Sequence, residues 1–219
     1  MRARACRTFS MTGRSKAPER AGLGVRAHSG WAAYVVLGGK VQAPDILERG
    51  RMELCDAEIK GSKQPFHEAE PMPFESGSKF IARCEEATAT LADAALATLE
   101  LQFGPLAACV ILTASGRRLP DLRTILASHA LIHAAEGEFY RDAIASACTR
   151  KNILAERVRE RDLAAVADRL PGNEAARQTR IDAFGKQVGT PWRQDEKLSA
   201  LAAWLALAAR PTRNPLRAP

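Results

Sequence analysis

Hydrophobic and polar positions alternate with a period of two from residue 21 onward. Over 21–28 the odd-numbered residues are apolar, whereas Arg26 and His28 fall on the opposite side, which is typical of a strand with one buried face. A Ser-Gly pair then indicates a turn, and the apolar run 31–37 predicts a returning strand. The pattern therefore predicts a hairpin at this end of the fold.

The rest of the sequence alternates between long stretches of helical periodicity and short apolar runs. The elements expected, in order, are a weak strand at 51–55, a proline-containing loop at 56–75, a helix at 76–102, a buried strand at 107–113, a helical region at 120–148 with Ser128 as an internal cap, a polar strand at 153–159, a helix at 162–170, an irregular segment at 171–191 and a helix at 195–209. Three leading strands followed by strands that alternate with helices predict a three-layer α/β fold. Its mixed five-stranded sheet would have helices on both faces.

Composition adds the class of protein. A length of 219 residues with 46% hydrophobic residues is sufficient for one domain, which we expect to span 21–209. No apolar run approaches the roughly 20 residues of a membrane helix, so we expect no membrane association. The five cysteines show no paired spacing, which favours free thiols and a cytoplasmic location.

The net charge of +7 is concentrated at the two ends of the sequence. The segments 1–20 and 210–219 together hold nine basic groups and one acidic group, which leaves 23 basic and 24 acidic groups between them. We expect both segments to be disordered, as a basic leader and a Pro/Arg tail. Binding that depends on bulk charge is therefore predicted to involve the ends rather than the folded part.

The order of elements resembles the ribonuclease H-like superfamily, including its Holliday-junction resolvase branch. Two motifs carry the resemblance, GVRAHSGWAAYVVL in the first hairpin and QDEKLSALAAWLAL in the final helix, and it extends over 21–209. A flavodoxin-like sheet is the alternative. The resemblance implies cleavage of phosphodiesters by two divalent metals, which carboxylates hold. Here Arg26 occupies the first-strand acid position, the fourth strand ends in Thr113 without an acid, and Asp195 is present on the last helix.

A second group of candidate ligands lies in the segment SHALIHAAEGEFYRDA. At about 100° per residue, His129, His133 and Glu136 fall within about 60° of one another on a helix. Histidine and glutamate at this spacing can converge on one cation, so we predict a site for Mg, Mn or Zn. The alternative is that these residues form hydrogen bonds at the margin of a buried stripe.

The topology places the end of the first strand beside the fourth strand and the start of the last helix. We therefore expect a single cleft, with a catalytic set and a set that binds phosphate. The catalytic candidates are Glu136, Asp195, His133 and His28. The candidates for binding phosphate are Arg26 and Ser115. For His28 alone, a half-buried structural histidine is the alternative.

Three functions are compatible with these residues. The first is a divergent metal-dependent enzyme that acts on phosphodiesters or other phosphate compounds, with nucleic acid or a phosphate-containing ligand as its partner. The second is a relative of the same fold that has lost the carboxylates and serves in binding or as a scaffold. The third is a nucleotide-phosphate binder that uses the HSG and SGR turns. Convergence of the polar residues in one cleft would favour the first, and scattered positions the second.

Overall fold

The computed structural model describes residues 20–114 and 118–209, and its centre is a five-stranded sheet in the order β3-β2-β1-β4-β5. The strands are β1 (Ala21–His28), β2 (Trp31–Lys40), β3 (Ala43–Glu53), β4 (Leu106–Thr113) and β5 (Leu154–Arg159). β1 pairs antiparallel with β2 and parallel with β4, and β5 continues the parallel half. The first strand is therefore central, as the sequence predicts.

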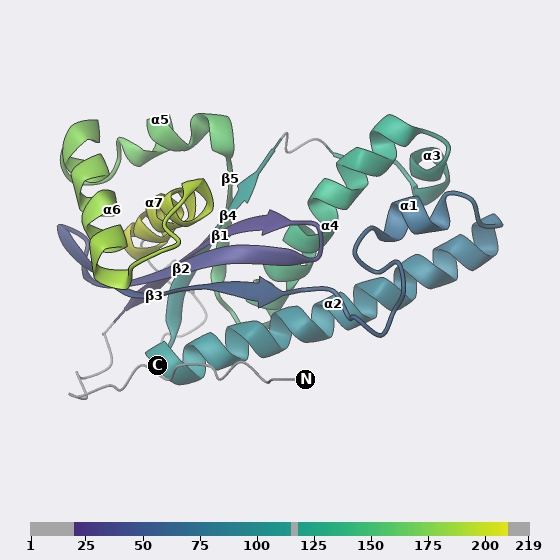
Figure 1. The fold of residues 1–219 in the computed structure, drawn as a ribbon, viewed down its shortest axis with the longest axis horizontal. Helices are drawn as coiled ribbons and strands as arrows, with labels where there is room; N and C mark the ends of the chain where they lie inside the picture. Colours follow the sequence, from purple (N-terminus) through teal and green to yellow (C-terminus); the bar gives the residue numbers. More distant parts are fainter. Residues whose placement is uncertain (1–19, 115–117, 210–219) are drawn as a thin grey trace, which may run out of the picture.

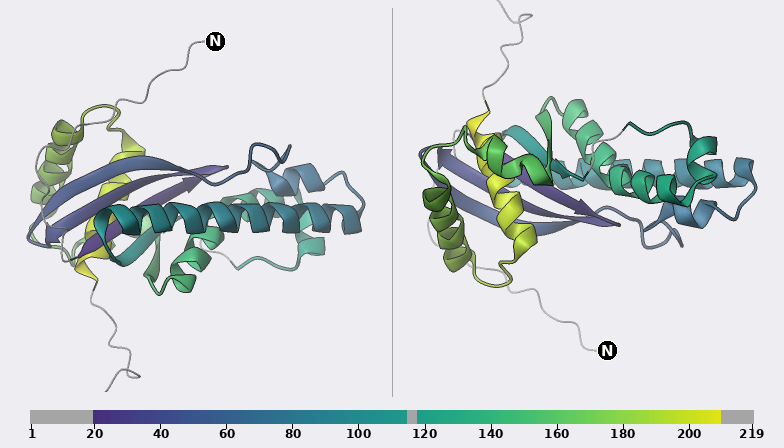
Figure 2. Two further views of the ribbon diagram at one scale, coloured as in Figure 1. Left: turned by 90° about the horizontal axis from the view of Figure 1, so that it is seen from below. Right: turned by 90° about the horizontal axis from the view of Figure 1, so that it is seen from above.

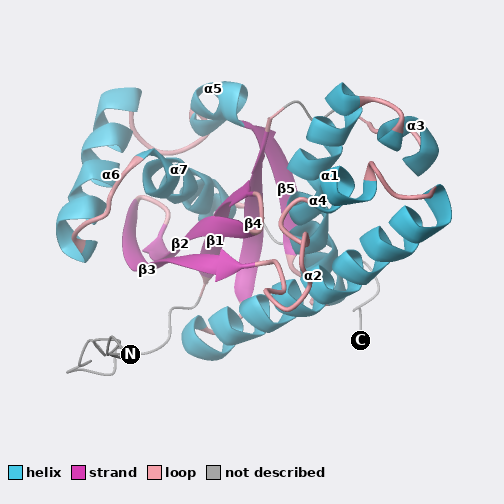
Figure 3. Ribbon diagram, turned by 45° about the vertical axis from the view of Figure 1, so that its right-hand side comes forward, coloured by secondary structure: helices cyan, strands magenta, loops and turns pink. Residues whose placement is uncertain are grey.

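Helices cover both faces of the sheet (Figures 1 and 3). They are α1 (Pro65–Ala69), α2 (Phe74–Phe103), α3 (Leu122–Leu126), α4 (His129–Arg150), the 3₁₀ turn η1 (Glu160–Asp162), α5 (Leu163–Ala167), α6 (Glu174–Val188) and α7 (Gln194–Ala208). The long helix α2 crosses one face and α7 crosses the other, as the two views in Figure 2 show. None of the helices within the described ranges is long and apolar enough to span a membrane.

The alternation along β1 separates two hydrophobic cores. Leu23 and Val25 are fully buried on the side of α2 and α4. On the opposite face, Val35 of β2 and Val110 of β4 pack against α7. β1 itself contributes almost no side-chain volume to this second core, because the residues that face it are Gly22 and Gly24, followed by Arg26.

Those glycines allow α7 to lie directly on β1. A Cβ atom added to Gly22 or Gly24 would lie less than 3.0 Å from main-chain atoms of α7, a separation that real Cβ atoms essentially never show. Helix backbone therefore occupies the space that side chains would fill at these two positions. The consequence is that the first turn of α7, with Asp195, is brought beside the C-terminal end of β1.

Three expectations about elements need correction. β3 begins at Ala43 and not near residue 51, because residues 43–50 lack the alternation of apolar and polar positions that identifies a strand. The segment 171–191 contains α6, whose buried residues are few. The loop at 56–75 contains the short helix α1, with Pro65 at its first turn.

Some predictions fall on residues 1–19, 115–117 and 210–219, which lie outside the described ranges. They are the disordered leader, the C-terminal tail and the assignment of Ser115 to a phosphate site. The predicted domain from 21 to 209 stays a prediction.

Candidate functional site

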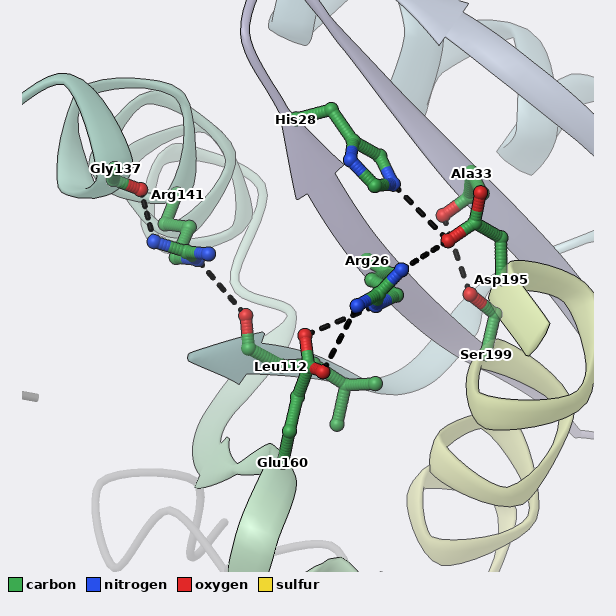
Figure 4. A network of polar contacts seen from close by, with 9 residues as sticks. All are labelled: Arg26, His28, Ala33, Leu112, Gly137, Arg141, Glu160, Asp195 and Ser199. Carbon is green, nitrogen blue, oxygen red and sulfur yellow. Dashed lines mark hydrogen bonds and ion pairs between the residues drawn. The ribbon is translucent and has the colours of Figure 1, made fainter. Parts of the chain in front are cut away.

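A charged network centred on Arg26 lies at the C-terminal end of β1 (Figure 4). The Arg26 guanidinium donates two hydrogen bonds to the carboxylate of Glu160 in η1, from Nε at 2.9 Å and from Nη2 at 3.0 Å. Its Nη1 donates to Oδ1 of Asp195 in α7. One cation therefore joins two carboxylates from elements that are distant in the sequence.

The electrostatics of this network fix its charges. The hydrogen bond to Glu160 raises the pKa of Arg26 above its usual value, although burial opposes the shift. Burial alone would raise the pKa of Asp195, but the hydrogen bond from Arg26 and the proximity of His28 outweigh it and lower that pKa. The side chains of Arg26 and Asp195 are only 21% and 28% exposed, and both stay ionised near neutral pH.

His28 extends the network toward the edge of the sheet. Its Nε2 lies 3.1 Å from Oδ1 of Asp195, and its ring stacks on Trp31 with 4.3 Å between centroids. On the other side of β2, the guanidinium of Arg51 in β3 lies 4.2 Å from the centre of the same indole. Trp31 is thus packed between neighbours from both adjacent strands and is not a free platform for a base.

A second arginine lies beside the end of β4. Arg141 of α4 is buried, and its Nε donates to the carbonyl oxygen of Leu112 at 2.9 Å while Nη1 donates to the carbonyl oxygen of Gly137. Burial lowers the pKa of Arg141. The carboxylate of Glu138 lies 3.3 Å from Nη1 and offsets part of the charge. A cation, and not an acid, therefore faces the end of β4.

These residues do not fit the pair of divalent metals that the resemblance implies. Two hard cations need several free carboxylate oxygens at the ends of the first and fourth strands. Arg26 stands at the first of these positions and engages both Glu160 and Asp195. The fourth strand supplies no acid, since the sequence from Leu106 to Arg118 contains none.

A separate group of three histidines joins α1 to the first turns of α4. His67, His129 and His133 each offer a ring nitrogen, and these nitrogens all lie within 4.8 Å of one another. The Nε2 atoms of His129 and His133 are 3.1 Å apart. These three residues are called the histidine group below.

Glu136 supports the histidine group from the interior. Its Oε1 accepts hydrogen bonds from the backbone N–H groups of Phe66 at 2.8 Å and His67 at 3.1 Å, and it lies 3.2 Å from Nδ1 of His67. The carboxylate is 6% exposed, and this burial raises its pKa, although the hydrogen bonds from His67 and Phe66 oppose the shift. Glu136 therefore contacts a histidine that is distant in the sequence, and does not itself join the three ring nitrogens.

The expected single cleft is divided in two. Arg26, His28 and Asp195 lie together on the face that α7 covers. The predicted candidates His129, His133 and Glu136 lie with His67 in the layer of α1 and α4, on the opposite face. Within the described residues, no hydrogen bond or ion pair joins the two groups. His129, His133 and Glu136 do lie on one side of α4, but that side faces α1 and not the end of β1.

Sequence reasoning missed two participants. Glu160 lies in the charged run RVRERD, whose pattern is typical of a polar edge strand. β5 is such a strand, and Glu160 follows it directly. His67 lies in a segment without regular periodicity, so its position relative to α4 had no signal. The glycine pair at 22 and 24, on the same side of β1 as Arg26, was the available signal for a helix that approaches this strand closely.

Among known proteins, only solved structures are similar to this chain, and their similarity concerns the fold. No protein-family model matches the sequence. No curated protein matches it at a significant level. Among solved structures, Thermus thermophilus RuvC in complex with a Holliday junction substrate is similar at a TM-score of 0.50 and 10% identity, over 85% of this chain and 91% of that chain. Another Thermus thermophilus RuvC structure has a TM-score of 0.47 and 7% identity, over 84% and 91%. The first likeness confirms the predicted ribonuclease H-like fold.

Proposed function

We propose that this protein, whose fold is ribonuclease H-like, binds nucleic acid without hydrolysing it by a two-metal mechanism. The observation that carries the proposal is the Arg26 guanidinium, bonded to Glu160 and Asp195 at the end of the central strand. In this arrangement a fixed side-chain cation neutralises the carboxylates that exchangeable metal ions would need. The second function considered above, a binding or scaffold protein that has lost the carboxylate site, is therefore favoured.

The energetics favour retention of the ion pairs. Hydrogen bonds to charged groups contribute about 1.5–3 kcal/mol each, and removing one partner leaves a partly desolvated charge. A divalent ion would have to displace Arg26 from both carboxylates while the guanidinium stayed nearby, because β1 fixes it. Repulsion between the two cations then adds to the cost of binding.

Nucleic acid is proposed as the ligand on two grounds. The similar structure of RuvC was solved with a Holliday junction substrate, which makes branched DNA the first ligand to test. The excess of basic residues in 1–20 and 210–219 supplies positive charge for phosphate contacts, while the residues between them are nearly neutral.

The test incubates the full chain with a four-way DNA junction and with linear duplex, in Mg²⁺ or Mn²⁺. We expect a mobility shift that weakens steeply with salt, and no cleavage with either metal. Asp195→Ala provides the matched variant, since Asp195 is the carboxylate that the resemblance assigns to the metal site. Metal-dependent cleavage by the parent that disappears in Asp195→Ala would overturn the proposal, as would the absence of any binding.

A second candidate function is a divergent metal-dependent phosphate-processing enzyme that acts at the histidine group. The convergence of three ring nitrogens favours it, because such ligands can hold a metal with an open position. It predicts hydrolysis of a simple phosphodiester, bis(p-nitrophenyl) phosphate, in Zn²⁺ or Mn²⁺, with loss of activity in His133→Ala and retention in Asp195→Ala. The primary proposal expects no hydrolysis in any of these proteins.

A further inference from the structure

We infer that His67, His129 and His133 bind one divalent transition-metal ion of the zinc class. The site lies between α1 and α4, apart from the Arg26 network, and the inference does not depend on the proposed function. It differs from the metal site expected from the sequence, because His67 replaces Glu136 among the ligands.

The separation of the ring nitrogens matches a common metal ligand geometry. Two nitrogens that each lie 2.0–2.1 Å from a tetrahedral zinc ion are about 3.4 Å apart. The Nε2 atoms of His129 and His133 are 3.1 Å apart, and the nitrogen of His67 lies within 4.8 Å of both. Small rotations of exposed imidazole rings are sufficient to close the remaining difference.

The backbone holds these ligands near one another in advance. His129 and His133 are four residues apart at the beginning of α4, so their side chains lie on the same side of the helix. His67 comes from α1, whose buried residues Phe66 and Ala69 anchor it in the core. The rings of His67 and His133 are in edge contact, with centroids 4.7 Å apart. Little conformational entropy is therefore lost when a cation binds.

Glu136 is a positioning residue for His67. Its Oε1 lies 3.2 Å from Nδ1 of His67, which leaves Nε2 of that ring available as a ligand. A carboxylate behind a histidine in this way fixes the tautomer and makes the imidazole a better donor. Within the described residues, the second oxygen of Glu136 is buried without a hydrogen-bond partner.

Two carboxylates compensate for an unfavourable feature of the site. The beginning of a helix carries partial positive charge, which opposes cation binding at His129. Glu136 is buried next to His67, and Oε1 of Glu70 lies 4.0 Å from Nδ1 of His129. Their negative charge offsets the helix dipole at the position of the ion.

The ligand set also defines the ion. Imidazole nitrogens suit zinc, copper, nickel and iron, whereas magnesium and calcium need oxygen ligands. Three protein ligands leave a fourth coordination position, as in zinc sites that hold water or a substrate. Since the His129 side chain is 67% exposed, that position is open to solvent.

Thermal unfolding and calorimetric titration of the full chain with ZnCl₂ test the inference. We expect one equivalent of Zn²⁺ to bind and, at about one hundred times its Kd, to raise Tm by about 5–10 °C. MgCl₂ at the same concentration should have no effect. A parent protein without this rise would overturn the inference.

The variants separate the site from other zinc contacts. His129→Ala and His133→Ala replace exposed side chains, so both should fold and lose the zinc-induced rise. Glu136→Gln should weaken zinc binding by about 10–100-fold. His28→Ala is the matched control, because His28 lies outside the histidine group, and it should keep the full effect. Retention of the rise in His133→Ala, or its loss in His28→Ala, would contradict the assignment.

Discussion

Arg26 links the end of the central strand to η1 and α7. Its guanidinium bonds to Glu160 and Asp195, and its side chain is 21% exposed. We expect Arg26→Ala to lower the free energy of unfolding at pH 7 by about 1–2 kcal/mol, toward the lower end because solvent screens this partly exposed pair. Urea unfolding measures the loss. Arg161→Ala, which replaces an arginine with 71% side-chain exposure, should change stability by less than about 0.5 kcal/mol.

The same pair predicts a dependence on pH. The pKa of Asp195 is lowered in the folded protein by Arg26 and His28, against the effect of burial. Its stabilising contribution is therefore complete above the unfolded pKa of about 3.9 and is lost as pH falls through the lower folded pKa. The difference in stability between the parent and Arg26→Ala should be constant from pH 6 to 8 and shrink below about pH 4. If this difference in the free energy of unfolding is undiminished at pH 3, the ion pair between Arg26 and Asp195 does not cause it.

Individual site residues were predictable where the topology alone determines their position. Arg26 and Asp195 lie at the end of the central strand and the beginning of the last helix, so the order of elements brings them together. His67 is different, because it is 62 positions from His129 and lies in a segment without periodicity. Glu160 has many charged neighbours in sequence, and nothing in the pattern selects it as the partner of Arg26.

At the scale of elements, α7 packs directly against the backbone of β1, and Gly22 and Gly24 are the signal for this contact in the sequence. We expect Gly24→Ala to destabilise the protein by at least about 2 kcal/mol, because the new methyl group would overlap main-chain atoms of Ser199 and Ala203. A second substitution, Ala203→Gly, should not restore stability, since the obstacle is backbone. Chemical denaturation of both variants tests this.

Gly137 provides the matched control for that prediction. A methyl group there would meet only the terminal nitrogen of Arg141, at 3.2 Å, and alanine is the better helix former by about 1 kcal/mol. Gly137→Ala should therefore change the free energy of unfolding by less than about 1 kcal/mol. A large loss in this variant would mean that the hydrogen bond from Arg141 to the Gly137 carbonyl group holds α4 in place.

Helices that bury many apolar side chains were predicted from the sequence, whereas elements that bury few were not. α2 and α7 bury many side chains and have boundaries within two residues of those expected. α6 buries only Arg177, Ile181 and Phe184, so its sequence resembles a loop with a few apolar residues. β3 lies at an edge of the sheet, and its residues from Ile46 to Gly50 all have intermediate burial, so the alternation that identifies a strand is absent there.

At the scale of the whole molecule, the excess of positive charge lies in the two ends of the sequence and not in the residues between them. The residues between the two basic ends have 23 basic and 24 acidic groups, so a chain that begins at Ala21 should lose much of its salt-sensitive binding to polyanions. The measurement is the slope of log K against log salt concentration for a four-way junction, in both lengths of chain. An unchanged slope would locate the phosphate contacts in the folded part.

The sheet order was predictable because three strands before the first long helix leave few arrangements. A hairpin followed by a crossover places the fourth strand parallel to the first, and the observed order β3-β2-β1-β4-β5 follows. The order of elements does not specify how the side chains of the helices pack between the layers. The separation of the histidine group from the Arg26 network depends on that packing.

The face of β1 that carries Gly22 and Gly24 has a consequence for folding during synthesis. Arg26 and Asp195 are 169 residues apart, and at 5–20 residues per second the ribosome needs about 8–34 seconds to proceed from one to the other. During that interval β1 is complete but α7 does not yet exist, so the flat backbone around Gly22 and Gly24 is open to any other helix or strand. Because α7 is synthesised last, we expect slow translation to prolong the exposure of this surface and to increase aggregation.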